Sequence, residues 1–184
     1  MTRLIRPVFV VAICILPCLV ATRAAEPDGK PLEPCVVITG PDSRVTECRY
    51  HRITSDEEWT RVWREHTGQK PAAEDDPHSG PITFPSVDFN HYMVVAIFQG
   101  NGWNSRGLRA VSISENDQRI TFRFEDQSYQ TLSREGSGEG ANKVTVYGFF
   151  VVPRSKKPVV LEENVQQYLG QPPVWKERIT FPKL

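Results

Sequence analysis

The sequence lacks most of the features that would assign it to a specialised class of protein. It has only four cysteines, too few for a scaffold held together by disulfides, and no apolar run long enough to cross a bilayer. It also lacks an excess of basic charge, because basic and acidic side chains number 22 each. Nucleic-acid binding needs a basic surface that releases counterions, so we expect no nucleic-acid partner.

Catalytic and cofactor motifs are missing as well. The sequence has no His-Glu-x-x-His motif, and the stretch Gly136–Gly140 lacks the Lys-Ser or Lys-Thr pair that ends a phosphate-binding loop. Asp75, Asp76 and His78 come nearest to a metal-binding set, but such runs are usually solvated loop. We therefore predict no catalytic residue, no metal and no cofactor.

The first 25 residues have the pattern of an export signal. Two arginines precede the apolar run Val8–Ala21, and small residues follow it. This pattern predicts a signal peptide cleaved near Ala24 or Ala25, and a periplasmic or secreted protein. The alternative is a lipid anchor on Cys18, which is disfavoured because Pro17 stands where a lipid-attachment signal has a small residue.

The remainder of the chain, residues 26–184, is predicted to form a single domain without an integral membrane segment. It carries 19 basic and 22 acidic side chains, a net charge of −3. A domain of this size buries roughly 70% of the surface that its unfolded chain exposes, which is enough for one core.

Two cysteines remain after removal of the signal. Cys35–Thr39 and Arg44–Ile53 have strand composition, and the four residues between them favour a turn. A hairpin closed by that turn would place Cys35 opposite Cys48, within reach of a disulfide. We expect this bond to form in an oxidising compartment and to stabilise the fold by about 3 kcal/mol.

One helix is strongly indicated. Ser55 and Glu58 form a capping box, and Gly68 supplies a stop. Between them, apolar and aromatic side chains recur on one face at helical spacing: Trp59, Val62, Trp63 and His66. We interpret this face as core that packs on a sheet.

Strands dominate the rest of the chain. Met93–Phe98 is apolar throughout, which is typical of a central strand covered on both faces. Further strands are expected at Leu108–Ser114, Arg119–Glu125, Val144–Val152 and Arg178–Phe181, whereas Pro158–Gly170 fits either a strand or a short helix. The predicted fold is α+β: a mostly antiparallel, curved sheet of about six to eight strands with one amphipathic helix packed on it.

Two segments offer candidate binding residues. Gly100–Gly107 follows the most apolar strand, reads as a flexible loop and carries a tryptophan among polar residues. Large aromatic side chains on loops are enriched at binding hot spots, although this one could equally fold back onto the sheet edge. The candidates are Asn101, Trp103, Asn104 and Arg106, with Trp175 in the extended Pro-Pro-Val-Trp segment as a second site.

The order of these features resembles the PrcB C-terminal domain family of exported bacterial proteins. The resemblance lies in the two helix tryptophans, then Val87-Asp88-Phe89, then Met93–Phe98 followed by Gln99-Gly100, and it covers roughly Thr54–Val152. After Gly100 the family has a Thr-Gly-Gly-Tyr-like turn that this chain lacks. The resemblance implies a non-catalytic accessory subunit of a protease complex, with no active-site residues to transfer.

These observations predict an exported, non-enzymatic binding or accessory protein with a protein partner in the cell envelope. The alternative is a small exported hydrolase whose site would be assembled by the fold from paired acids or from His51, His78 or His91. A carbohydrate-binding module would use the same aromatic segments as a protein-binding one.

Overall fold

The structure is a computed structural model that describes residues 28–69, 85–131, 140–166, 168 and 170–184. The expected signal peptide, the Asp75, Asp76 and His78 cluster and most of Gly136–Gly140 lie outside the described residues.

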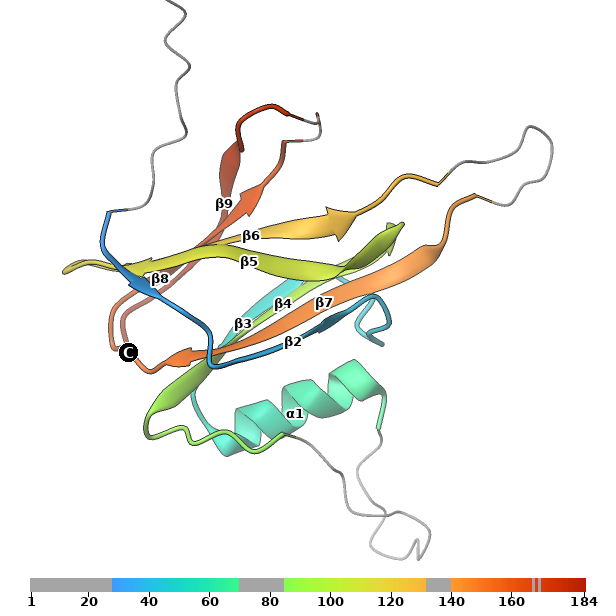
Figure 1. The fold of residues 1–184 in the computed structure, drawn as a ribbon. Helices are drawn as coiled ribbons and strands as arrows, with labels where there is room; N and C mark the ends of the chain where they lie inside the picture. Colours follow the sequence, from blue (N-terminus) through green and yellow to red (C-terminus); the bar gives the residue numbers. More distant parts are fainter. Residues whose placement is uncertain (1–27, 70–84, 132–139, 167, 169) are drawn as a thin grey trace, which may run out of the picture.

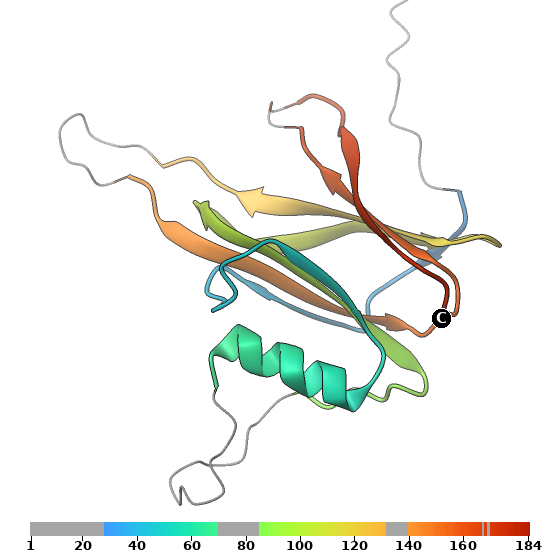
Figure 2. The same ribbon diagram turned by 180° about the vertical axis from the view of Figure 1, so that it is seen from behind.

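The described residues form one helix and nine strands, arranged in three layers (Figures 1 and 2). The elements are β1 (Lys30–Leu32), β2 (Val36–Gly40), β3 (Arg49–Ile53), α1 (Asp56–Thr67), β4 (Tyr92–Trp103), β5 (Ser105–Glu115), β6 (Ile120–Ser128), β7 (Lys143–Pro153), β8 (Val159–Asn164) and β9 (Trp175–Phe181).

The strands divide into two sheets. One has the order β1-β5-β6-β8-β9 and the other β2-β7-β4-β3, and every neighbouring pair is antiparallel except β6 and β8. In Figure 1 the five-stranded sheet lies above the four-stranded sheet, and α1 covers the outer face of the latter. The predicted α+β fold with mostly antiparallel strands is confirmed, with the strands shared between two facing sheets.

Strand β4 shows why three layers form. Its side chains alternate between two cores: Met93, Val95 and Ile97 face the second sheet, whereas Val94, Ala96 and Phe98 face the helix. All six residues are buried, as expected for a strand covered on both faces. Asp88 forms the turn that leads into β4, because its side chain accepts a hydrogen bond from Asn90 N at 3.0 Å.

Helix α1 begins and ends where the sequence predicts. The Ser55 hydroxyl accepts a hydrogen bond from Glu58 N at 3.3 Å, and Gly68 closes the helix with a left-handed φ of 70°. Trp59 is buried, and its ring lies 5.1 Å from that of Phe149 on β7. The aromatic face of the helix is therefore core, as expected.

The expected hairpin and its disulfide are wrong. Strands β2 and β3 lie at opposite edges of the four-stranded sheet, with β7 and β4 between them. Three strand spacings of about 4.8 Å separate β2 from β3, well beyond the roughly 7 Å that a disulfide spans between Cα atoms. Cys35 and Cys48 precede these two strands, and both thiols are free and exposed. The long apolar strands β4 and β7 occupy the centre, because only there are both their faces covered.

The segment Pro158–Gly170, which fitted either a strand or a short helix, begins with a strand. Residues Val159–Asn164 form β8, which runs parallel to β6, and β9 closes this sheet as expected.

Replacing Trp59 with Ala should lower the free energy of unfolding by about 3–5 kcal/mol, because it opens a cavity between α1 and the sheet. The matched control is Trp103→Ala, which removes an exposed ring and should change stability by no more than about 0.5 kcal/mol. Denaturant titrations of both variants measure the difference, and equal losses would contradict the layer assignment.

Titration of the native protein lacking residues 1–25 should find two reactive thiols per chain, since both are free and exposed. The double replacement of Cys35 and Cys48 with Ser should leave the free energy of unfolding within about 1 kcal/mol of the parent. A loss near the roughly 3 kcal/mol that a disulfide provides would contradict this arrangement.

Candidate functional site

The predicted loop Gly100–Gly107 is instead a corner at which the chain passes from one sheet to the other. Strand β4 runs to Trp103, and β5 begins at Ser105. Asn101–Trp103 pair with Thr145–Lys143 of β7, after a bulge between Phe98 and Gly100. The corner is therefore built from strands, and its side chains are held in fixed directions.

Gly100 permits the bulge that starts this corner. Its φ is 76°, and a Cβ there would lie 2.6 Å from the carbonyl oxygen of Thr46. Any other residue would collide with the Thr46 backbone, so glycine is required. The close approach also lets Asn101 N donate a hydrogen bond to the same oxygen at 3.2 Å.

Asn104 fastens the corner to the neighbouring strands. It has a left-handed φ of 51°, a conformation that asparagine tolerates better than most residues. Its backbone N donates to Asn142 O at 2.9 Å, and its side-chain oxygen accepts from Asn142 N at 2.8 Å. Its carbonyl accepts from Tyr129 N at 2.8 Å. These bonds join the end of β6 to the start of β7, so Asn104 acts here as a structural residue.

Trp103 is the exposed aromatic residue of the corner, with 55% of its surface accessible. Its partner across the strands is Lys143, whose Nζ lies 5.6 Å from the centre of the indole ring. These two residues and Asn101 line a cavity of about 230 Å³ together with Gly102 and Val144. The corner thus combines an apolar ring, a cation and a hollow beside them.

Arg106 provides a second cation next to an aromatic ring. Its guanidinium carbon lies 5.5 Å from the ring centre of Tyr129, and its side chain is exposed. Both cations belong to the corner: Arg106 follows Asn104 by two residues, and Lys143 pairs with Trp103 across the strands. Sequence reasoning missed Tyr129 and Lys143, because only sheet pairing brings these distant residues to the corner.

Trp175 belongs to a different part of the molecule. It begins β9, and the guanidinium of Arg123 on β6 lies 4.8 Å from its ring centre. Arg123 also forms an ion pair with Glu162 at 2.7 Å. Because Trp175 is half-buried and already stacked, it fastens the last strand to its sheet.

Two carboxylates, Asp126 and Glu163, bear on the hydrolase alternative. Burial raises the pKa of Asp126 above its ordinary value; Glu163 acts in the same direction, and the Ser105 hydroxyl hydrogen bond opposes them. Glu163 accepts hydrogen bonds from Gln99 at 2.9 Å and from Arg178 at 2.5 Å. Both acids are thus engaged within the protein, an arrangement that fits a structural role as well as a catalytic one.

The described histidines have structural contacts. His66 is buried at the end of α1, where its Nδ1 lies 3.1 Å from Ser43 Oγ and its ring centre 4.1 Å from that of Tyr147. His91 is exposed and lies 2.7 Å from Asp88, whereas His51 packs edge-on to Phe98. His78 is outside the described residues.

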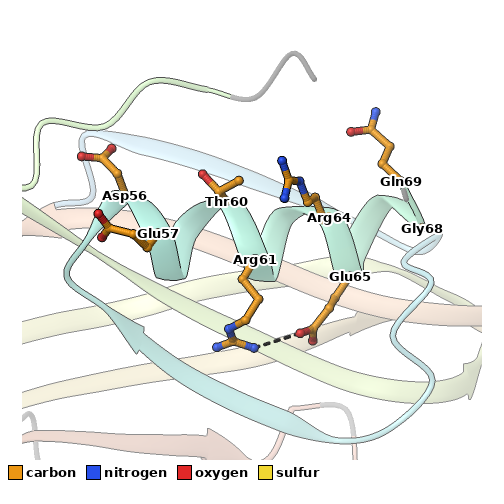
Figure 3. A pocket seen from close by; sticks show the side chains of 8 residues that line it. All are labelled: Asp56, Glu57, Thr60, Arg61, Arg64, Glu65, Gly68 and Gln69. Carbon is orange, nitrogen blue, oxygen red and sulfur yellow. Dashed lines mark hydrogen bonds and ion pairs between the residues drawn. The ribbon is translucent and has the colours of Figure 1, made fainter. Parts of the chain in front are cut away.

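A larger hollow of about 800 Å³ runs along the solvent-facing side of α1 (Figure 3). Its lining consists mainly of charged and polar helix residues: Asp56, Glu57, Thr60, Arg61, Arg64, Glu65, Gly68 and Gln69. Arg61 bonds Glu65 at 2.8 Å across one turn. Charges of both signs pair along this face, as is usual on an exposed helix.

Over the described ranges, no three or more His, Cys, Asp or Glu side chains gather in a group that could hold a metal ion. The only helix within those ranges is too short and too polar to span a bilayer.

We expect stability to fall as the pH drops below about 6.5. Burial lowers the pKa of His66, so the unfolded chain takes up a proton that the folded protein resists. The loss due to His66 begins at the ordinary histidine pKa and ends at the lower pKa of the folded state, with a slope of at most about 1.4 kcal/mol per pH unit for this one group. Unfolding titrations from pH 7.5 to 5 measure it.

His66→Gln should flatten this pH dependence, leaving the part due to His51, whose pKa burial also lowers. His51→Gln is the matched variant, because it removes the other imidazole whose pKa burial lowers, and it should leave the part of the slope that is due to His66. An unchanged slope in His66→Gln would exclude His66 as its source.

No protein-family model, curated protein or solved structure matches this chain. The resemblance to the PrcB C-terminal domain family stays a prediction, and function has to be inferred from the geometry of the corner.

Proposed function

We propose that this protein is an exported, non-enzymatic binding or accessory protein that docks onto a partner protein of the cell envelope. The contact surface is the corner formed by Asn101, Trp103, Arg106 and Lys143. The observation that carries the proposal is the exposure of Trp103, a large aromatic ring with more than half of its surface accessible on a strand whose backbone is paired. Tryptophan and arginine are the residues most enriched at binding hot spots.

The rigidity of the corner favours binding. Trp103 is paired with Lys143 on one side, and Asn104 follows it with hydrogen bonds to two neighbouring segments. A side chain presented by an ordered backbone loses less conformational entropy when it is captured. The ring is therefore already placed for contact in the unbound protein.

The charge of the corner indicates the chemistry of the partner. Lys143 and Arg106 each lie close to an aromatic ring, and neither forms an ion pair with an acidic side chain of the described ranges. A partner that presents a carboxylate beside an apolar side chain would match both the cations and the indole. The resemblance to an accessory subunit of a protease complex supports the same role.

The second candidate function is a small exported hydrolase, with Asp126 and Glu163 as its carboxylates. The raised pKa of Asp126 is the observation in its favour, because general acids have raised pKa values. The hydrogen bonds that engage both acids favour the binding role.

We expect Trp103→Ala to fold normally and to lose partner capture. A photo-crosslinking residue in place of exposed Asn101 should attach the protein to one partner in its own cells. Trp103→Ala should then weaken that attachment about thirtyfold, the equivalent of about 2 kcal/mol for a hot-spot residue.

Tyr168→Ala is the matched control, since Tyr168 is an exposed aromatic residue of the β8–β9 connection, and it should crosslink as the parent does. Undiminished crosslinking by Trp103→Ala would exclude the corner. If Asp126→Asn and Glu163→Gln both left crosslinking intact but abolished a hydrolytic activity, the second candidate would replace the first.

A further inference from the structure

Three of the four sheet edges in the described chain are protected against pairing with another strand. β1 contains a lysine and a proline, β3 has an exposed arginine, and β9 has three charged residues in succession: Lys30 and Pro31, Arg49, and Lys176, Glu177 and Arg178. Charges and proline on an edge strand discourage intermolecular β-pairing. These edges are therefore built to remain open to water.

The fourth edge, strand β2, has no such protection. From Val36 to Gly40 it contains neither a charged residue nor a proline. Val36 and Val37 point to opposite faces of the sheet, yet each has 47% of its surface exposed. β2 pairs with β7 on one side only among the described strands, so its two consecutive exposed valines form an apolar edge that favours pairing with a further strand.

Contacts on both faces of the sheet fix the backbone of β2 in the extended conformation that pairing requires. On the helix side, Ile38 packs against the core beneath α1. On the other side, the Thr39 hydroxyl accepts a hydrogen bond from Leu108 N at 2.6 Å and donates one to Tyr147 O at 2.8 Å. The strand is thus fixed in an extended conformation, and no strand within the described ranges pairs with its outer edge.

A cavity of about 230 Å³ lies beside this edge on the helix side. Its lining is mostly apolar and includes Val36, Ile38, Trp59, Val87, Tyr92 and Phe149. A strand added next to β2 would project alternate side chains onto this face of the sheet. The cavity offers space for one of them.

We propose that β2 pairs antiparallel with β2 of a second copy of this chain. A two-fold axis normal to the sheet brings identical strands together, and the absence of charge means that no like-charge contacts arise within them. Such an axis keeps the helix-side faces of both copies on the same side. The exposed side chain of Val36 from one copy then enters the cavity of the other, whose lining has the same apolar chemistry.

The pairing joins two four-stranded sheets into one of eight strands. Because β2 has only five residues, the interface is small, and we expect an association that depends on protein concentration. The proposal is independent of the partner-binding corner, because Trp103 takes no part in it.

Val37→Lys tests the proposal by placing a positive charge from each copy at the interface. In sedimentation over a concentration series, the parent should dimerise, and Val37→Lys should raise the dissociation constant at least about tenfold. Val111→Lys is the matched control, because Val111 is an exposed valine on the interior strand β5, and it should dimerise as the parent does. A parent that is monomeric throughout, or an unchanged dissociation constant in Val37→Lys, would overturn the proposal.

A cysteine series gives a second measurement that does not depend on the charged variant. In a two-fold antiparallel pair one residue faces its own copy, with Cα atoms roughly 4.5–5.5 Å apart. Five variants each carry a single cysteine. In the first, the native Cys35 is kept and every other cysteine is replaced with Ser. In the other four, all native cysteines are replaced with Ser and one of Val36→Cys, Val37→Cys, Ile38→Cys or Thr39→Cys is added. Diamide then oxidises facing thiols to a disulfide.

One of these five positions should crosslink much faster than its neighbours, and that position marks the two-fold axis. Val111→Cys should remain monomeric. If no position crosslinks faster than Val111→Cys, the β2 edge is not the interface, and an extended segment of another protein becomes the occupant to seek.

Discussion

The fold depends on the requirement that β4 and β7 bury both of their faces. Each strand is apolar on consecutive residues, so a single covering layer would leave half of these side chains in water. The second sheet covers one face and α1 covers the other, which places Val95 and Phe150 in one core and Ala96 and Phe149 in the other. The three layers, the central position of both strands and the displacement of β2 and β3 to the edges all follow from this requirement.

Sequence patterns predicted the parts of the fold that local interactions determine. The limits of α1 follow from the Ser55 cap and from Gly68, and the buried face of the helix follows from the spacing of its tryptophans. The pairing of strands could not be predicted in the same way. The residues between β2 and β3 have the composition of a hairpin turn, but turn composition carries no information about competition with longer strands. β2 pairs with β7 and not with β3, because β7 is the longer and more apolar strand. Without the hairpin, the two cysteines are too far apart for the expected disulfide.

The candidate site could be predicted only in part, again because the sequence does not show which strands pair. The sequence identified Trp103 as an aromatic residue among polar neighbours but left open whether its ring folds back onto the sheet. The answer depends on Lys143, which lies forty residues later and pairs with Trp103 only because β4 and β7 are neighbours. Asn104 was expected to contact a partner, and the structure uses its amide and its left-handed backbone to turn the corner. A polar residue of a short connection fits either role until its hydrogen-bond partners are known.

The corner and the β2 edge are both consequences of the central strands. β4 ends in the corner, where more than half of the surface of Trp103 is exposed. β7 carries β2 on its outer side as the last strand of its sheet. Pairing through β2 would give one assembly two copies of Trp103, each with its own Lys143. Two linked binding sites raise the effective concentration of the second once the first is occupied, provided that the partner can reach both. A corner of modest affinity would then suffice for stable attachment, because the exposed edge supplies the second site without adding any contact to the first.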